Sequence, residues 1–261
     1  MVSGVRKTAA ARSRRLAVVF PAEPTDRTLS APATWLSDPL LADASACAGS
    51  DVRRVLTGRA VLGAAVVQPA LVALQLVGFR RLLACGVSPC LVVGVGAGEI
   101  AAWAASGAIG DHDALRLAAL RGAAVELASL VHPATRRSSP GGWNSIAMAP
   151  AREVIAAAAA AAPRMLRHVP QVESVGGAVL ADDEAPDLGL QLVEPPAWRS
   201  ILDAFLRHGV TDVAVLPPGR TARNVVQDAL GATSVHTAEG DRDLDALARA
   251  LAPKQEEAKT G

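Results

Sequence analysis

The sequence predicts an α/β fold with a mostly parallel sheet, and three observations support this prediction. First, the runs Leu16–Phe20 and Cys90–Gly94 are apolar without alternating polar residues, as expected of strands buried on both faces. Second, such runs alternate with longer stretches whose apolar residues recur at helical spacing. Third, Pro21 follows the first run and Gly86 precedes the second, so both boundaries carry turn residues. The 261 residues suffice for one large domain with a substantial core.

The first half of the chain is predicted to alternate strongly between strands and helices. A loop and helix region over residues 22–60 follows the first strand, and a polar loop is expected at residues 132–143. The remaining predicted elements are a helix at Val61–Cys85, a strand at Cys90–Gly94, a helix at Glu99–Ser106 and a helix at Ala114–Leu127 with Asp111 as its N-cap.

The second half is predicted to continue the same alternation up to residue 252. Its predicted elements are a short strand at Ser145–Ala149, a helix at Ala151–Ala162, one or two helices within Gly189–Leu206, a strand at Asp212–Leu216, a further helix after Gly219, a strand at Ser234–Thr237 and a helix at Leu244–Leu251. Residues 1–15 form a basic tail and residues 253–261 a polar tail, and both are expected to be disordered.

The composition excludes several classes of protein. A formal charge of +1 with 20% charged residues disfavours both disorder and nucleic-acid binding. The three cysteines, Cys47, Cys85 and Cys90, show no CxxC spacing, and they are expected to be small buried side chains in a reducing compartment. With only five histidines, neither a metal site nor a cofactor is expected.

The N-terminus does not have the pattern of an export signal. The apolar run after Arg14 and Arg15 spans only Leu16–Phe20, which is too short for the apolar region of a signal peptide. No window approaches about 18 uninterrupted apolar residues, so no membrane-spanning helix is predicted. We therefore expect a cytoplasmic protein without a membrane partner.

A glycine-rich turn over Gly94–Glu99 separates a predicted strand from a predicted helix. A dinucleotide-binding fingerprint would need glycine at its sixth position, where Glu99 stands. The spacing of Gly94, Gly96 and Gly98 fits the nucleophile-elbow pattern G-x-S-x-G better. In that pattern a strained turn exposes one side chain above the sheet. The nucleophile position is then Gly96, which tolerates the strained backbone but has no side chain to attack a substrate.

Several ordered motifs together resemble the malonyl-CoA:acyl carrier protein transacylases and the acyltransferase domains of polyketide synthases. The resemblance covers roughly residues 16–145 and 172–250 and implies the α/β-hydrolase-like parallel sheet of that family. The matching segments are Val19-Phe20-Pro21, Gln68-Pro69-Ala70, Gly94–Glu99, Gly107-Ala108, Arg121-Gly122, Gln191-Leu192, Pro196-Ala197-Trp198 and Pro218-Gly219.

The departures from the family pattern concern its catalytic residues. The acyl-carrying serine of the family aligns with Gly96 and the preceding histidine with Val95. The family inserts a ferredoxin-like small subdomain, followed by a catalytic histidine in an F-H-S motif. Residues 144–171 supply at most one strand and one helix there, and the motif is absent, so the small subdomain is expected to be largely deleted. His168 does not match the family histidine.

The resemblance also implies a binding site. Arg121 aligns with the arginine that clamps the malonyl carboxylate, and its alternative role is a structural ion pair to Glu99. Gln68 aligns with a glutamine of the cleft, and its alternative role is that of a residue at the N-terminus of a helix. The implied substrate-binding residues are Arg121, Gln68, Glu23, Gly96 and Ala97. Two arginine pairs, Arg136 with Arg137 and Arg164 with Arg167, are expected to be solvated, and they could form a basic rim that acidic carrier proteins would favour.

Three functions are compatible with these residues. The first is a catalytically degenerate subunit of polyketide or fatty-acid biosynthesis that binds a carrier protein, a CoA or acyl thioester, or a partner synthase, because loss of the serine and its base removes covalent acyl transfer. The second is a repurposed enzyme that acts without an acyl-enzyme and uses groups such as Glu23, Glu99, Arg121 and His168. The third is residual acyltransferase or thioester hydrolase activity through another nucleophile.

Overall fold

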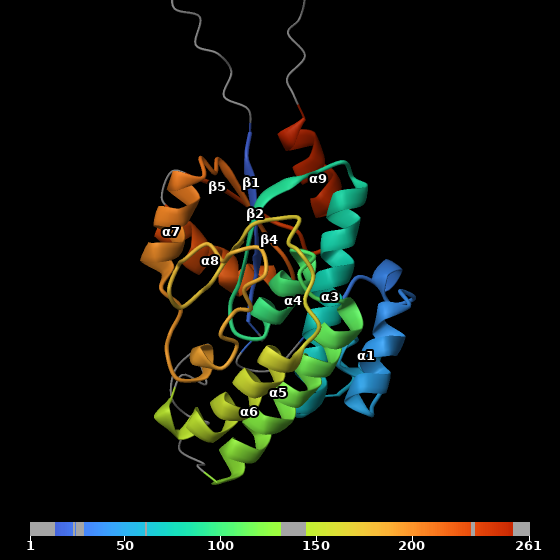
Figure 1. Ribbon diagram of the computed structural model, residues 1–261. Helices are drawn as coiled ribbons and strands as arrows, with labels where there is room; N and C mark the ends of the chain where they lie inside the picture. The colour runs from blue at the N-terminus through green and yellow to red at the C-terminus, as the bar shows by residue number, and fades with distance from the viewer. Residues whose placement is uncertain are drawn as a thin grey trace, which may run out of the picture.

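The computed structural model describes residues 14–22, 24, 29–60, 62–131, 145–230 and 233–252. Within these ranges the chain forms a five-stranded sheet of order β3-β2-β1-β4-β5 with helices on both faces (Figure 1). Every pairing is parallel, which confirms the predicted class. The strands are β1 Leu16–Phe20, β2 Pro89–Gly94, β3 Gln171–Val172, β4 Asp212–Val215 and β5 Ser234–Thr237.

The central strand β1 explains the uninterrupted apolar run near the N-terminus. All five of its residues are buried, between β2 and β4 in the plane of the sheet and between helices on its two faces. Leu16, Val18 and Phe20 point into one apolar cluster, while Ala17 and Val19 point into another. A strand buried on both faces cannot alternate apolar with polar residues.

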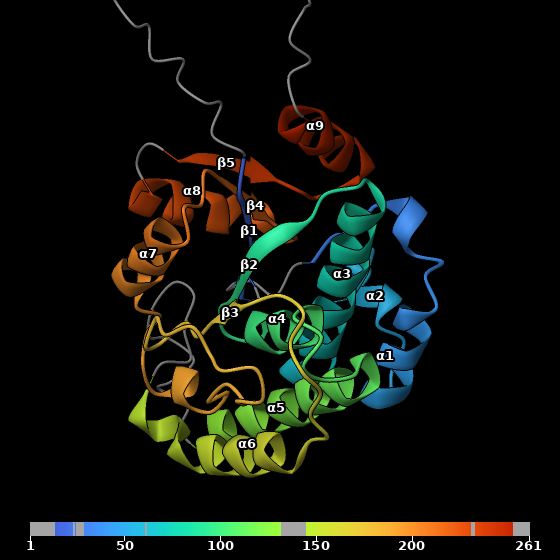
Figure 2. The same cartoon turned by 45° about the horizontal axis from the view of Figure 1, so that its top comes forward.

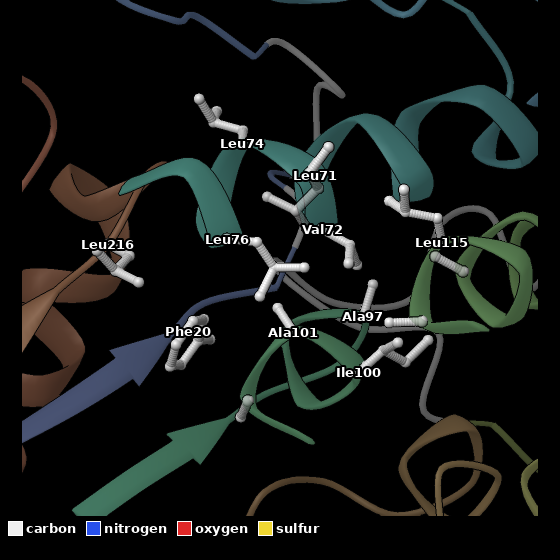
Figure 3. Close-up of a cluster of buried hydrophobic side chains, with 14 of the residues drawn as sticks. Phe20, Leu71, Val72, Leu74, Leu76, Ala97, Ile100, Ala101, Leu115 and Leu216 are labelled. Carbon is white, nitrogen blue, oxygen red and sulfur yellow. The ribbon is translucent and has the colours of Figure 1, made fainter. Parts of the chain in front are cut away.

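Helices divide between these two clusters. The larger cluster collects α1 (Leu40–Ala48), α3 (Ala64–Ala84), α4 (Gly98–Ala105), α5 (Asp111–Val131) and α9 (Asp241–Leu251). The smaller one lies under α7 (Trp198–Arg207) and α8 (Gly219–Leu230). Figure 3 shows the centre of the larger cluster, where Phe20 of β1, Leu76 of α3 and Ala101 of α4 meet. The helices α2 (Arg53–Leu56) and α6 (Ala149–Ala161) also contribute to the larger cluster. The described residues form 3₁₀ turns at Ala33–Trp35, Ile146–Met148 and Leu190–Leu192.

Two expectations about local structure are wrong. The segment predicted as a strand at Ser145–Ala149 forms a 3₁₀ turn, because the Ser145 hydroxyl accepts a hydrogen bond from the Ala147 N–H at 3.3 Å and Pro150 then opens α6. Asp111 is the first residue of α5 rather than its N-cap. The short strand β3 was not predicted, since two residues carry no periodic pattern.

The helix α3 is the central helix of the larger cluster. By length and composition it could cross a membrane, but 78% of its apolar window is buried inside the protein, as in the core helix of a globular domain. Arg15 lies beside the sheet and donates from Nε to the His208 carbonyl at 2.7 Å. Of the predicted tails at residues 1–15 and 253–261, residues 1–13 and 253–261 lie outside the described residues. Arg14 and Arg15 are described, and the expectation of disorder is wrong for them because Arg14 pairs with Asp212 at 3.4 Å and Arg15 bonds to His208.

One polar side chain of α3 connects both halves of the sheet. Gln75 is fully buried, and its Nε2 donates to the Pro21 carbonyl at 2.7 Å and to the Pro217 carbonyl at 3.0 Å. Pro21 follows β1 and Pro217 lies just after β4, so a single amide fixes the loops that leave two neighbouring strands. Buried carbonyls without such a donor are costly.

Replacing Gln75 with alanine should therefore destabilise the fold. Gln75→Ala removes the shared donor of two buried carbonyls, and we expect the free energy of unfolding to fall by about 2–4 kcal/mol. Urea unfolding followed by circular dichroism measures this change. Leu83→Ala, an exposed position on the same helix, serves as the control and should cost far less; equal losses for the two variants would contradict the role given to the amide.

Candidate functional site

The turn between β2 and α4 has the form of an elbow. The chain leaves the strand at Gly94 and enters the helix at Gly98, so only Val95, Gly96 and Ala97 make the connection. Gly96 has a φ of 58°, in the left-handed region that favours glycine. The Glu99 N–H then donates to the Gly96 carbonyl at 3.1 Å and starts the helical pattern. This geometry matches the elbow predicted from the G-x-G-x-G frame.

Close approach to β1 fixes this elbow in place. The Val95 N–H donates to the Phe20 carbonyl at 2.9 Å, and the Gly98 α-carbon lies so near that carbonyl that a Cβ would overlap it. A Cβ at Gly94 would likewise overlap the backbone of Glu99. The two outer glycines are therefore required by packing and the middle one by its backbone angle.

The residues at the apex of the elbow differ in accessibility. Val95 and Gly96 are half-buried, whereas Ala97 is fully buried. Ala97 faces α3 and α5, near Val72 and Leu115 (Figure 3). The side chain of Ala97 packs in the apolar core, and its predicted substrate-binding role stays a prediction. No side chain at Gly96 is available for nucleophilic chemistry.

Behind the elbow lies a buried carboxyl group. Glu99 is fully buried, and its Oε2 accepts a hydrogen bond from the Ser174 hydroxyl at 3.0 Å. Burial raises the pKa of Glu99 well above its ordinary value of 4.5. The Ser174 hydrogen bond lowers this pKa, the charge of Glu173 raises it, and the charge of Arg121 has the smallest influence and lowers it. Burial therefore favours the neutral form of Glu99 more strongly than in an ordinary, solvated glutamate.

The two predicted cleft residues lie on helices that pack against α4. Gln68 belongs to α3 and Arg121 to α5, and both side chains are buried. Their helices contact each other and the elbow helix, and the charge of Arg121 acts on Glu99. Because the charge of Arg121 is the smallest influence on the pKa of Glu99, both roles of Arg121, the carboxylate clamp and the structural ion pair, stay predictions. Glu23 lies outside the described residues.

The structure does not bring His168 to the elbow. Its backbone N–H donates to the Ser106 carbonyl at 2.7 Å, and its exposed ring lies against Gly107. Ser106 and Gly107 follow the C-terminal end of α4, while Gly96 precedes its N-terminal end. Because α4 has eight residues, and an α-helix rises ~1.5 Å per residue, the two sites are separated by about 12 Å along the helix.

The predicted basic rim is wrong for one of its described members. Arg164 is exposed, but Arg167 is buried and donates hydrogen bonds to the Ala181 and Glu184 carbonyls. Desolvation lowers the pKa of Arg167, and neighbouring acidic groups, Glu184 first, raise it. Arg136 and Arg137 lie outside the described residues.

Neither the cysteines nor clustered metal-ligating side chains in the described residues indicate a functional site. The three cysteines are free thiols; Cys47 and Cys90 are half-buried, and burial raises the pKa of both. The expectation that all three are buried is wrong for Cys85, which is exposed in the turn after α3. Within the described ranges, no three His, Cys, Asp or Glu side chains gather as metal ligands would.

Two residues important for this region were not singled out from the sequence. Gln75 interrupts an apolar stretch of α3, and a lone amide in such a stretch is a signal that its side chain has a buried partner. Ser174 follows the unpredicted strand β3, and nothing in its own neighbourhood of the sequence indicates Glu99 as its partner.

Comparison with known proteins agrees with this geometry. Residues 35–175, more than half of the chain, match the acyl transferase domain family, and the chain belongs to that family. It is 32% identical over 172 residues to the malonyl CoA-acyl carrier protein transacylase of Mycolicibacterium smegmatis, covering 62% of this chain. The match spans 55% of that transacylase, little more than half of its length.

Solved structures share the fold at lower identity. MCAT from Mycobacterium tuberculosis superposes with a TM-score of 0.78 at 23% identity, covering 90% of this chain and 100% of that chain. A malonyl-transacylase solved in complex with its type II polyketide synthase acyl-carrier protein superposes with a TM-score of 0.76 at 18% identity, covering 90% and 99%. At these identities the likeness establishes the fold.

The raised pKa of Glu99 makes stability depend on pH. Below pH 4.5 the Glu99 carboxyl is neutral in both the folded and the unfolded chain. Above pH 4.5 this carboxyl ionises first in the unfolded chain, so the free energy of unfolding falls as the pH rises toward the pKa of the folded state. Glu99→Gln removes this loss. Relative to the parent, the variant should gain up to about 1.4 kcal/mol per pH unit within that window.

Urea unfolding at a series of pH values from 4 upward would test this expectation. Glu153→Gln, an exposed position on α6, is the matched control and should follow the parent. A Glu99→Gln variant whose stability runs parallel to the parent at all pH values would show that the carboxyl ionises normally in the fold.

Proposed function

We propose that this chain is a catalytically degenerate acyltransferase-family protein of polyketide or fatty-acid biosynthesis. In this proposal it binds an acyl carrier protein, an acyl thioester or a partner synthase and does not transfer the acyl group itself. The single observation that carries the proposal is the elbow, whose backbone geometry is retained while the nucleophile position holds Gly96.

The absence of a nucleophile is decisive for the family's covalent chemistry. An acyl-enzyme needs a hydroxyl or thiol above the sheet and a base within hydrogen-bond reach. Gly96 offers no such group, and the neighbouring position holds Val95. His168, the histidine nearest in sequence to the segment expected to hold the catalytic base, lies at the far end of α4. Loss of one member of a catalytic unit already removes most of the rate.

The connection between α6 and β3 also supports the proposal. Residues 162–170 form this link, which is far shorter than the about 30 residues that a single βαβ unit needs. The shortness of this link supports the proposed loss of the ferredoxin-like subdomain. In this proposal the substrate cleft would lack the wall that such a subdomain provides.

Retention of the rest of the scaffold favours binding as the remaining role. The elbow, the helices that carry Gln68 and Arg121 and the parallel sheet are all present. A fold neighbour is a malonyl-transacylase in complex with its acyl-carrier protein. We extend that kind of partner to this chain as part of the proposal.

A repurposed enzyme is the second candidate, and Glu99 is the observation that favours it. A buried carboxyl with a strongly raised pKa next to an elbow is the kind of group that general acid catalysis uses. Its complete burial argues against direct contact with a substrate, so we rank this candidate below the binding role.

Covalent loading provides the first test. After incubation with malonyl-CoA, intact-mass spectrometry should detect no malonyl adduct on the parent, whereas the M. smegmatis transacylase, as a positive control, should show one. Gly96→Ser should load at least about a hundredfold more slowly than that control, because no base has been located beside position 96 within the described residues. An adduct on the parent would overturn the non-catalytic proposal.

Carrier-protein binding provides the second test. Isothermal titration of the full chain with holo acyl carrier protein should give a saturable isotherm, and malonyl-carrier protein should come off the titration chemically unchanged. Consumption of the malonyl thioester without an adduct would favour the repurposed enzyme, and Glu99→Gln should then abolish it. A flat isotherm with both carrier forms would remove carrier-protein binding from the proposal.

A further inference from the structure

A cavity of about 240 Å³ lies beside β5, the strand at one edge of the sheet. Its lining comes from β5, α8 and α9, and both helices contact this strand. Because α8 packs in the smaller apolar cluster and α9 in the larger one, these two helices cover opposite faces of the sheet. The cavity therefore lies at the edge of the sheet, where Figure 2 shows β5 between the two helices.

This cavity is separate from the elbow. The elbow follows β2, and both β1 and β4 lie between β2 and β5 in the sheet. Neighbouring strands are ~4.8 Å apart, so three strand spacings place the two regions about 14 Å from each other. Its lining includes no residue of the elbow and neither of the predicted cleft residues Gln68 and Arg121.

Opposite charges line the cavity from its two helices. Arg223 lies in the first two turns of α8 and Asp243 in the first turn of α9. No ion pair joins these two side chains, and Arg223 has no carboxylate partner elsewhere among the described residues. One oxygen of Asp243 accepts the Glu239 N–H at 3.0 Å, and its charge is not balanced by a described cation. The two charges thus border one small space without neutralising each other directly.

The rest of the lining suits the body of a small organic molecule. Val235 and Leu247 supply apolar surface, and Thr237 adds a hydroxyl. His236 also lines the cavity, but its Nε2 lies 3.1 Å from a carboxylate oxygen of the fully buried Asp212, which balances any charge on the ring. Pockets for drug-sized ligands span about 300–1,000 Å³, so a volume of about 240 Å³ indicates a smaller occupant.

We propose that this cavity binds a free α-amino acid with an apolar side chain. Arg223 binds the carboxylate of the ligand, Asp243 binds its ammonium group, and the apolar side chain contacts Val235 and Leu247. A ligand with a single charge would leave one of the two protein charges without a partner, whereas an α-amino acid pairs both. This inference is independent of the proposed carrier-protein binding.

Titration of the isotope-labelled full chain with L-leucine, followed by amide chemical shifts, tests the proposal. We expect saturable shifts at Val235, Thr237 and Ala246 with a Kd of about 1 mM, as is usual for so small a ligand. Leucinamide lacks the carboxylate and N-acetyl-leucine lacks the ammonium group. Each should bind at least about tenfold more weakly than leucine, because one charge–charge contact is lost.

Two variants assign each ligand charge to its partner. Arg223→Gln should weaken leucine binding about tenfold and leave leucinamide binding unchanged. Asp243→Asn should weaken leucine binding by a similar factor and leave N-acetyl-leucine binding unchanged. The second substitution keeps an oxygen acceptor for the Glu239 N–H, so the start of α9 should be retained.

Matched controls separate the cavity from net charge and from misfolding. Arg249→Gln and Asp245→Asn change exposed residues of α9 that do not line the cavity, and both should bind leucine as the parent does. All four variants should keep the parent's amide spectrum away from the cavity. The proposal is wrong if leucine gives no saturable shifts at the cavity up to its solubility limit, or if leucinamide and N-acetyl-leucine bind as tightly as leucine.

Discussion

The contact between the elbow and the end of β1 is the constraint on which the rest of the site depends. The Phe20 carbonyl receives the Val95 N–H, and Gly98 packs directly on it, so β1, β2 and α4 meet at one point. Any side chain at Gly98 would push the helix off the strand. The position of α4 in turn sets where Glu99, Trp103 and the loops around β3 can lie. Backbone packing, rather than a catalytic side chain, defines the architecture here.

Beneath that contact the protein keeps polar groups where an apolar core would be simpler. Gln68, Glu99, Arg121 and Ser174 are all buried, and burial raises the pKa of Glu99 and so favours its neutral form. Burying such groups costs stability unless each finds a partner. Their persistence around an elbow without a nucleophile fits a scaffold whose geometry is preserved for binding.

How much could be predicted from the sequence depended on whether each feature is local. β1 and β5 were predicted at their observed bounds, and for β1 the reason is that an apolar run and its turn residue lie together in the chain. The elbow followed from three glycines in five residues. The Glu99–Ser174 hydrogen bond joins residues 75 positions apart, and the Gln75 amide contacts residues 54 and 142 positions away. No local pattern encodes these contacts. The prediction that Arg167 is solvated was wrong for the same reason, because the carbonyls that accept its hydrogen bonds belong to a later loop.

The Gln75 amide has a consequence for how the molecule moves. It belongs to the buried central helix, yet it holds the chain leaving β1 and the chain after β4. The loops at this end of the sheet therefore cannot detach while α3 remains in place. Opening of this region is coupled to loss of the core, and the backbone amides around Val95 should exchange with solvent as slowly as those of the central strands.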